Sequence, residues 1–268
     1  MPRLGVITIL WLLAGVWAPV WADPAQLARA RELYNARQFD DAIAAATLAR
    51  ADAAVSDAAA VVLARAHLER YRLAADPTDL GAARDALAAV RADQLSASDR
   101  LDFLIALGAS LFLEDDFGAA AELFDSAAVH AGRVRPDVRE TVLDWLGSAI
   151  ERRASTLGPE ARVDLFARLT TRMEAELAEA PGSRAAAYWM VASLRGQGAL
   201  DRAWDAAVAG WVRARLAGAA SAALRADLDT LVLDGLLPDM ARRAPSSERE
   251  ARMSELRAEW ELVKQKWR

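Results

Sequence analysis

The chain alternates stretches of helical periodicity with short breaks that carry proline or glycine, and this alternation limits its fold more than any other feature. Each stretch spans about 12 to 20 residues, with apolar residues at spacings of three and four, which is typical of amphipathic helices. Runs of β-branched and aromatic residues typical of strands are scarce. The sequence therefore predicts an all-α fold. The clearest breaks are Asp76-Pro77-Thr78, Arg135-Pro136-Asp137, Gly158-Pro159, Pro181-Gly182-Ser183, Gly196-Gln197-Gly198 and Ala244-Pro245-Ser246.

The composition agrees with closely packed helices and excludes several classes of protein. Alanine supplies much of a hydrophobic content of 54%, and alanine favours helix while offering little surface to bury. The chain has no cysteine, which excludes a disulfide framework, a cysteine-ligated metal site and a thiol-dependent enzyme. Arginines and acidic residues are interleaved along the chain and the formal net charge is -5. Because a local basic excess is missing, we expect no nucleic-acid partner.

Residues 1–22 have the pattern of a secretory signal peptide. Arg3 precedes an uncharged stretch from Leu4 to Trp21, and Val20-Trp21-Ala22 places small residues where signal peptidase reads them. We expect cleavage after Ala22 and a periplasmic chain that begins at Asp23. An uncleaved anchor is the alternative, because the apolar stretch approaches the ~20 residues that span a bilayer. No later stretch is long and apolar enough to span, so we expect no stable membrane insertion after cleavage.

A repeat pattern lies between residues 104 and 127. Small residues alternate there with large ones in two successive helical stretches, and this pattern resembles the tetratricopeptide repeat (TPR). In that family, small residues sit where paired helices cross most closely and large residues fill the gaps on either side. The small residues here are Gly108, Ala120 and Ala127, and the large ones are Leu104, Leu107, Leu111, Phe117 and Phe124.

Weaker copies of the pattern surround this repeat. Their second helices begin at equivalent positions, Phe39, Leu80, Phe117 and Leu200. The last interval is about twice the others, so a further hairpin belongs between them, and residues 137–155 and 160–179 fit it by periodicity. The resemblance is to divergent, secreted bacterial TPR proteins, and it implies a right-handed α-solenoid of about five hairpins over residues 23–216. An alanine-rich helical bundle is the alternative.

The tail, residues 217–268, does not match a repeat, and we expect it to be a C-terminal helical cap. Its last helix has a possible capping box from Ser247 to Glu250. We expect its apolar stripe to pack on the last hairpin, with Trp204 and Trp211 as neighbours. A coiled-coil or partner-binding helix is the alternative. The stripe consists of Met253, Leu256, Trp260, Val263 and Trp267.

Residues for catalysis or metal binding are not arranged in any recognisable motif. His67 and His130 are the only histidines and lie in different hairpins, so we interpret both as packing or surface residues. Acidic pairs such as Asp40-Asp41 fall near helix starts, where they favour the positive end of the helix dipole. Nucleophile elbows, phosphate loops and dinucleotide fingerprints are missing. We therefore expect no enzyme activity, no metal and no cofactor.

The resemblance implies a binding groove along the first helices of the hairpins. Residues of mixed apolar and polar character would face it and suit a protein partner or an extended peptide. We expect a scaffold for protein–protein interaction outside the cytoplasm, in assembly or maintenance of the cell envelope. A carrier for a small apolar or peptidoglycan-derived ligand in a closed superhelix is the alternative. The implied groove residues are Leu27, Arg31, Tyr34 and Asn35 in the first repeat, Ile105, Phe112 and Leu113 in the third, and Tyr188 and Arg195 in the last.

Overall fold

The structure is a computed structural model that describes residues 24–267, except for the side chains at positions 24, 219 and 220. The expected signal peptide, residues 1–22, lies outside this range. Every regular element described is a helix, which confirms the all-α prediction for this part of the chain. The elements are α1 (Pro24–Asn35), α2 (Phe39–Ala49), α3 (Ser56–Ala74), α4 (Pro77–Ala88), η1 (Ala92–Gln94), α5 (Ala97–Leu113), α6 (Phe117–Val134), α7 (Pro136–Ser155), α8 (Pro159–Glu179), α9 (Arg184–Gly196), α10 (Leu200–Arg213), η2 (Ala214–Ala220), α11 (Ser221–Leu231), η3 (Val232–Leu236), α12 (Leu237–Ala241) and α13 (Arg249–Lys266).

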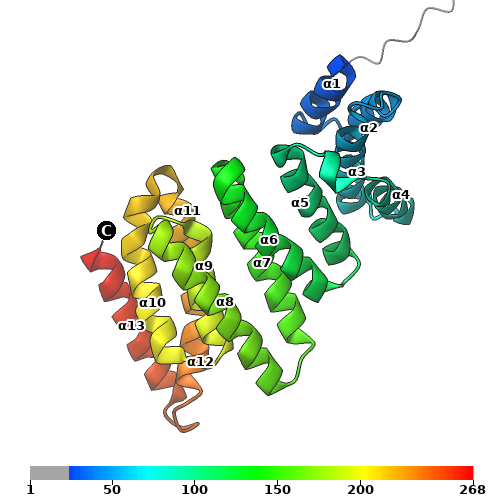
Figure 1. The fold of residues 1–268 in the computed structure, drawn as a ribbon. Helices are drawn as coiled ribbons and strands as arrows, with labels where there is room; N and C mark the ends of the chain where they lie inside the picture. Colours follow the sequence, from blue (N-terminus) through cyan, green and yellow to red (C-terminus); the bar gives the residue numbers. More distant parts are fainter. Residues whose placement is uncertain (1–23, 268) are drawn as a thin grey trace, which may run out of the picture.

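The helices form a curved stack in which each long helix packs on the next, and α1 and α13 lie at opposite ends (Figure 1). Alternate helices also touch: α1 contacts α3, α3 contacts α5, α7 contacts α9, and α9 contacts α11. We call the surface formed by these alternate helices the inner face. Direct contact between α5 and α7 is slight by comparison. None of the described helices is both long and apolar enough to cross a bilayer.

Three of the turns between helices share one backbone conformation. Arg37, Asp115 and Gly198 each lie two residues before α2, α6 or α10 and have φ angles of 61°, 62° and 75°. After each of them, an N–H donates to the carbonyl oxygen five residues earlier, which closes a Schellman-type turn. The same type of turn therefore precedes each of these three second helices. The donor and acceptor pairs are Gln38 to Leu33, Asp116 to Leu111 and Ala199 to Leu194, with N–O distances of 2.9, 2.9 and 3.0 Å.

The predicted close crossing of α5 and α6 is present. A Cβ atom added to Gly108 would lie 2.6 Å from the Phe124 ring, closer than packed atoms approach one another. Ala120 and Ala127 are fully buried on the facing side of α6. Small residues therefore allow these two helices to pack closely, as the repeat pattern predicts.

The buried residues form two hydrophobic cores. One core lies within α1 to α4, and the other extends from α5 to α13. Helix α5 contributes to both, because Leu101 and Ile105 belong to the larger core whereas Ala106 belongs to the smaller one. Helix α5 therefore joins helices α1 to α4 to the rest of the described chain.

The tail packs on the last hairpin, as predicted. Trp260 of α13 is fully buried, with ring centroids 5.8 Å from Trp204 and 5.4 Å from Trp211. Its indole N–H donates to Asp229 of α11 at 2.7 Å. Leu256 is also fully buried, and the other three residues of the predicted stripe pack partly buried against the same core.

The capping-box prediction for α13 is wrong. The helix begins at Arg249, its N-cap residue is Glu248, and that residue makes no side-chain capping bond. The N–H of Glu248 instead donates to the carbonyl oxygen of Pro245 at 2.9 Å. This turn shifts the helix start, so Ser247 does not occupy the N-cap position that a capping box requires.

Candidate functional site

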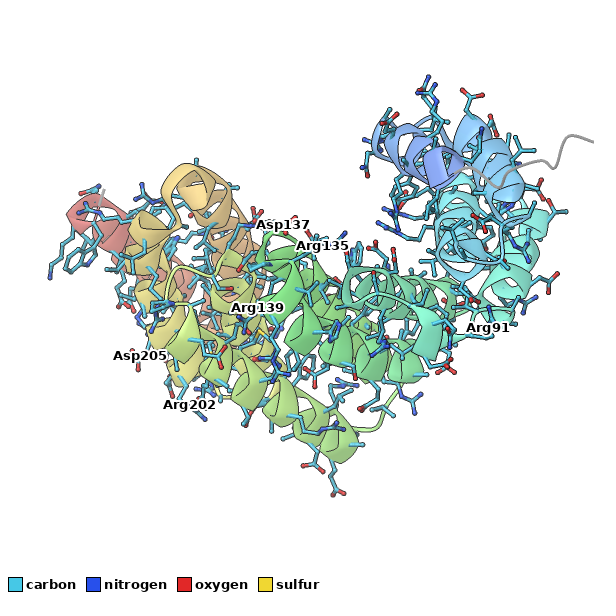
Figure 2. All side chains as sticks on the ribbon, turned by 45° about the horizontal axis from the view of Figure 1, so that its top comes forward. Arg91, Arg135, Asp137, Arg139, Arg202 and Asp205 are labelled. Carbon is cyan, nitrogen blue, oxygen red and sulfur yellow. The ribbon has the colours of Figure 1, made fainter. Side chains whose placement is uncertain are left out.

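A pocket of about 220 Å³ opens on the inner face where α1, α3, α5 and α7 come together. The stack bends there, and Arg135, at the start of α7, lies between its two arms (Figure 2). Phe124 of α6 is only 2% exposed and forms part of the floor beneath the gap between α5 and α7, which scarcely touch. The lining residues are Tyr34, Arg65, Leu68, Glu69, Arg72, Ile105, Ala106, Ala109, Phe112, Leu113, Phe124, Trp145 and Ser148.

Apolar side chains make most of the pocket wall. Phe124 and Trp145 stack in a tilted arrangement with centroids 5.6 Å apart. Phe112 packs edge-on against Phe117 at 5.1 Å, which holds its ring at the mouth. Phe112, Leu113 and Trp145 remain half-buried, so they expose apolar surface to a bound group. Such a wall suits a large apolar side chain.

Polar groups line the side of the pocket formed by α1 and α3. The Arg65 guanidinium lies 4.4 Å from the centroid of the Tyr34 ring, a cation–π contact. Burial raises the pKa of the Tyr34 hydroxyl, and the nearby Arg65 charge opposes this shift. Tyr34 therefore stays a neutral hydrogen-bonding group at physiological pH. Glu69 and Arg72 form an ion pair at 3.2 Å beside them.

Ion pairs fix this part of the inner face. Asp102 of α5 forms ion pairs with Arg65 at 2.9 Å and with Arg135 at 2.8 Å. Arg31 of α1 pairs with Asp99 at 2.5 Å. These contacts cross from α1 and α3 to α5 and α7, so they set the spacing of the helices that form the pocket.

The pocket brings together four of the expected groove residues, Tyr34, Ile105, Phe112 and Leu113. Two others lie close by on α1: Arg31 is engaged with Asp99, and Asn35 is exposed. Leu27 is only 6% exposed and packs inside the smaller core, so its side chain does not face a partner.

The last two expected groove residues lie apart from this pocket. Tyr188 is half-buried and packs edge-on against Trp189 at 5.1 Å. Arg195 donates to Asp239 of α12 at 2.5 Å, and its guanidinium lies against the backbone of Gly235. Arg195 is thus paired with a residue of the tail, a contact that the repeat pattern alone does not predict.

Sequence reasoning missed Leu68, Phe124 and Trp145 as pocket residues. Leu68 and Trp145 lie in helices whose repeat pattern is weak, and for Phe124 the repeat pattern predicts only packing between paired helices. A tryptophan in a weakly matching helix was the available signal for Trp145. The place of Phe124 in the pocket floor depends on the separation of α5 from α7, which no local pattern records.

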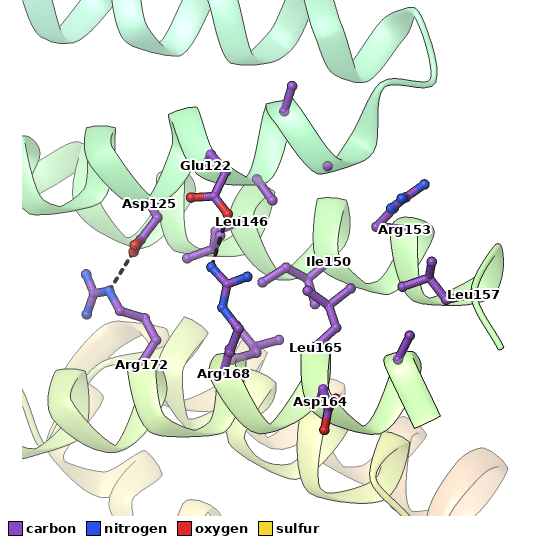
Figure 3. Close-up of a pocket in the computed structure, with 15 residues that line it drawn as sticks. Glu122, Asp125, Leu146, Ile150, Arg153, Leu157, Asp164, Leu165, Arg168 and Arg172 are labelled. Atoms are coloured by element: carbon purple, nitrogen blue, oxygen red, sulfur yellow. Dashed lines mark hydrogen bonds and ion pairs between the residues drawn. The ribbon is translucent and has the colours of Figure 1, made fainter. Parts of the chain in front are cut away.

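A second hollow of about 530 Å³ lies on the opposite side, between α6 and α8 with α7 beneath them. Leu146, Ile150 and Leu165 form part of its floor (Figure 3). Two ion pairs cross it, Arg168 with Glu122 at 3.1 Å and Arg172 with Asp125 at 2.8 Å. Its charged lining residues balance, so the hollow has no charge preference.

The two histidines are in packing contacts. His67 lies 2.7 Å from the buried carboxylate of Asp79, across the α3–α4 pair. His130 lies 3.2 Å from the carbonyl oxygen of Ala97. Among residues 24–267, no group of three or more histidine and acidic side chains is arranged to hold a metal ion.

Comparisons with family models, curated proteins and solved structures gave no match.

Proposed function

We propose that residues 23–216 form a right-handed α-solenoid of about five TPR-like hairpins, closed by the helical cap of residues 217–268. The shared turns before α2, α6 and α10 support this proposal, because one backbone geometry recurs at the predicted repeat positions. The close approach of Gly108 to Phe124 supports the TPR resemblance of the central repeat. The burial of Trp260 supports the role of the tail as a cap.

We propose that the protein is a non-catalytic scaffold that binds an extended segment of a partner protein on its inner face. The pocket of about 220 Å³ carries this proposal. It is smaller than the roughly 300–1,000 Å³ of typical small-molecule sites, so it suits one anchoring side chain of a larger partner. Its neutral tyrosine and paired arginines supply hydrogen bonds to a peptide backbone.

The apolar lining favours a second candidate, a carrier for a small apolar or peptidoglycan-derived ligand. Phe112, Leu113, Phe124 and Trp145 offer no hydrogen bonds apart from the single indole donor, which would suit an aliphatic ligand. The small volume weighs against it, because such a ligand would extend beyond the pocket onto the open inner face.

We propose that this binding takes place outside the cytoplasm, in assembly or maintenance of the cell envelope. The pattern of residues 1–22 supports export. N-terminal sequencing of the chain recovered from its host tests this step: we expect Asp23 as the first residue, whereas a chain that keeps Met1 would contradict cleavage.

Site-specific photo-crosslinking tests the scaffold function. A photoreactive phenylalanine analogue would replace Leu113 at the pocket mouth, and a matched one would replace the exposed Val163 of α8. We expect one protein to crosslink in the envelope fraction from position 113 and not from 163, with loss on Trp145→Ala. A co-purifying small molecule without a crosslinked protein would favour the carrier. Equal crosslinking from both positions would contradict binding at the pocket.

A further inference from the structure

The inner face differs in charge on the two sides of the pocket. On the side of α1, α3 and α5, the acidic groups are matched by arginines, as in the pairs of Arg31 with Asp99 and Arg72 with Glu69. Asp102 there is shared by two arginines, Arg65 and Arg135, which leaves one positive charge in excess. A partner segment crossing this side meets no net negative charge.

The side formed by α7, α9 and α11 is acidic. Arg184 of α9 lies between two carboxylates, 3.0 Å from Asp144 of α7 and 3.4 Å from Asp227 of α11. Glu151 of α7 adds an exposed carboxylate that takes part in none of the ion pairs between described residues. Glu151, Asp227 and Asp144 all influence Tyr188 electrostatically. Arg195 also acts on Tyr188, but its charge is paired with Asp239 of α12, so carboxylates outnumber guanidinium groups around this tyrosine.

This acidic region is continuous with the pocket. Ser148 lines the pocket, and Glu151 lies one helical turn further along the same side of α7. Three residues of helix rise by about 4.5 Å, and an extended segment advances about 3.3 Å per residue. A residue one or two positions from the anchored side chain would therefore reach Glu151. Asp227 of α11 borders the same region, because Glu151 and Asp227 both act on Tyr188.

We propose that the partner segment places a large apolar side chain in the pocket and carries lysine or arginine within about four residues of it, over Glu151 and Asp227. This inference rests on the proposed scaffold function and specifies its partner. The basic residues lie toward α9 and α11, so the charge asymmetry also fixes the direction in which the segment crosses the inner face.

Selection from a randomised dodecapeptide phage library tests this specificity. The target is the chain from Asp23 to Arg268, which contains every described residue. We expect recovered peptides to share a large apolar residue with lysine or arginine on one flank. The double variant Glu151→Gln/Asp227→Asn should keep the apolar preference and lower the basic enrichment about three-fold for each carboxylate removed, because exposed ion pairs are weak. The matched control Glu122→Gln/Asp41→Asn changes exposed acids elsewhere and should leave the enrichment unchanged.

The outcomes separate this inference from the proposed function. Apolar peptides without charge preference, lost on Trp145→Ala, would overturn the basic-partner inference and leave the scaffold function standing. A basic preference that survives in the Glu151→Gln/Asp227→Asn variant would also overturn it. If wild type and Trp145→Ala recover the same peptides, the pocket is not the binding site and both proposals fail.

Discussion

Arg65 of α3 and Asp102 of α5 form an ion pair at 2.9 Å that joins the smaller hydrophobic core to the helix shared by both cores. The same carboxylate accepts from Arg135 at 2.8 Å, at the start of α7. One acidic side chain therefore holds together three of the helices that surround the inner-face pocket. The spacing of these helices, and with it the pocket, depends on this carboxylate.

Asp102→Asn should lower the free energy of unfolding by about 1–2 kcal/mol. The side chains are 21% and 13% exposed for Arg65 and Asp102, so the loss lies between that of surface and fully buried ion pairs. Urea unfolding followed by circular dichroism measures it. Asp40→Asn is the control, because Asp40 also pairs with an arginine but is 87% exposed. Equal effects of the two substitutions would contradict a special role for Asp102.

Two glycine-to-alanine substitutions should have opposite effects. Gly108→Ala should destabilise by about 1–3 kcal/mol, because the added Cβ would overlap the buried ring of Phe124. Gly81→Ala should stabilise by about 0.5–1 kcal/mol, because Gly81 lies within α4 and has no atom within 4 Å of an added Cβ. Chemical denaturation of both variants checks this pair, and a stable Gly108→Ala protein would contradict the close crossing.

Trp260→Ala should destabilise by about 3–5 kcal/mol, since it empties a fully buried site between Trp204 and Trp211. Trp260→Phe keeps most of the packing but leaves Asp229 without its indole donor, so its cost should be smaller. Leu262→Ala, on the same helix but 64% exposed, should change stability by less than about 0.5 kcal/mol. Thermal unfolding that ranks the three differently would show that α13 is not docked in solution.

Asp57 should make the fold more stable at neutral pH than in acid. Hydrogen bonds from the Arg91 side chain and backbone N–H hold the pKa of this carboxyl below its usual range. Because the pKa of Asp57 is lower in the folded than in the unfolded chain, ionised Asp57 stabilises the fold at any pH above its unfolded-state pKa of about 3.9. This stabilisation is lost as the pH falls through the folded-state pKa. Asp57→Asn should therefore be less stable than wild type at pH 7, with a smaller difference near about pH 3. Urea unfolding across this range tests the prediction, and a difference that grows on acidification would contradict it.

The helices were predictable because their boundaries are marked locally. Pro77, Pro136 and Pro159 each occupy a first-turn position, and Asp76 caps α4 by accepting from the N–H of Thr78. The stripe of α13 was predictable for the same reason, because helical spacing alone placed Leu256 and Trp260 on one face. Only the capping-box prediction for that helix is wrong, because a turn between Pro245 and Glu248 shifts the helix start.

The site was predictable only in part, because it depends on contacts between distant segments. Tyr34, Phe112 and Leu113 follow from repeat positions, and they do meet at the pocket. Leu27 and Arg195 occupy equivalent positions but are taken up by the smaller core and by Asp239 of the tail. The contribution of Trp145 arises from the separation of α5 and α7, a tertiary feature with no local sequence signal.

The most direct test of binding at the inner-face pocket compares the affinity of the most enriched library peptide for three proteins. These are the wild type, the pocket variant Trp145→Ala and the control variant Leu165→Ala. Isothermal titration should show at least about ten-fold weaker binding for Trp145→Ala, since a central aromatic contact contributes more than 1.4 kcal/mol. Leu165→Ala, in the hollow on the opposite side, should bind as wild type does. Unchanged affinity for Trp145→Ala, or an equal loss for Leu165→Ala, would contradict a binding site at the inner-face pocket.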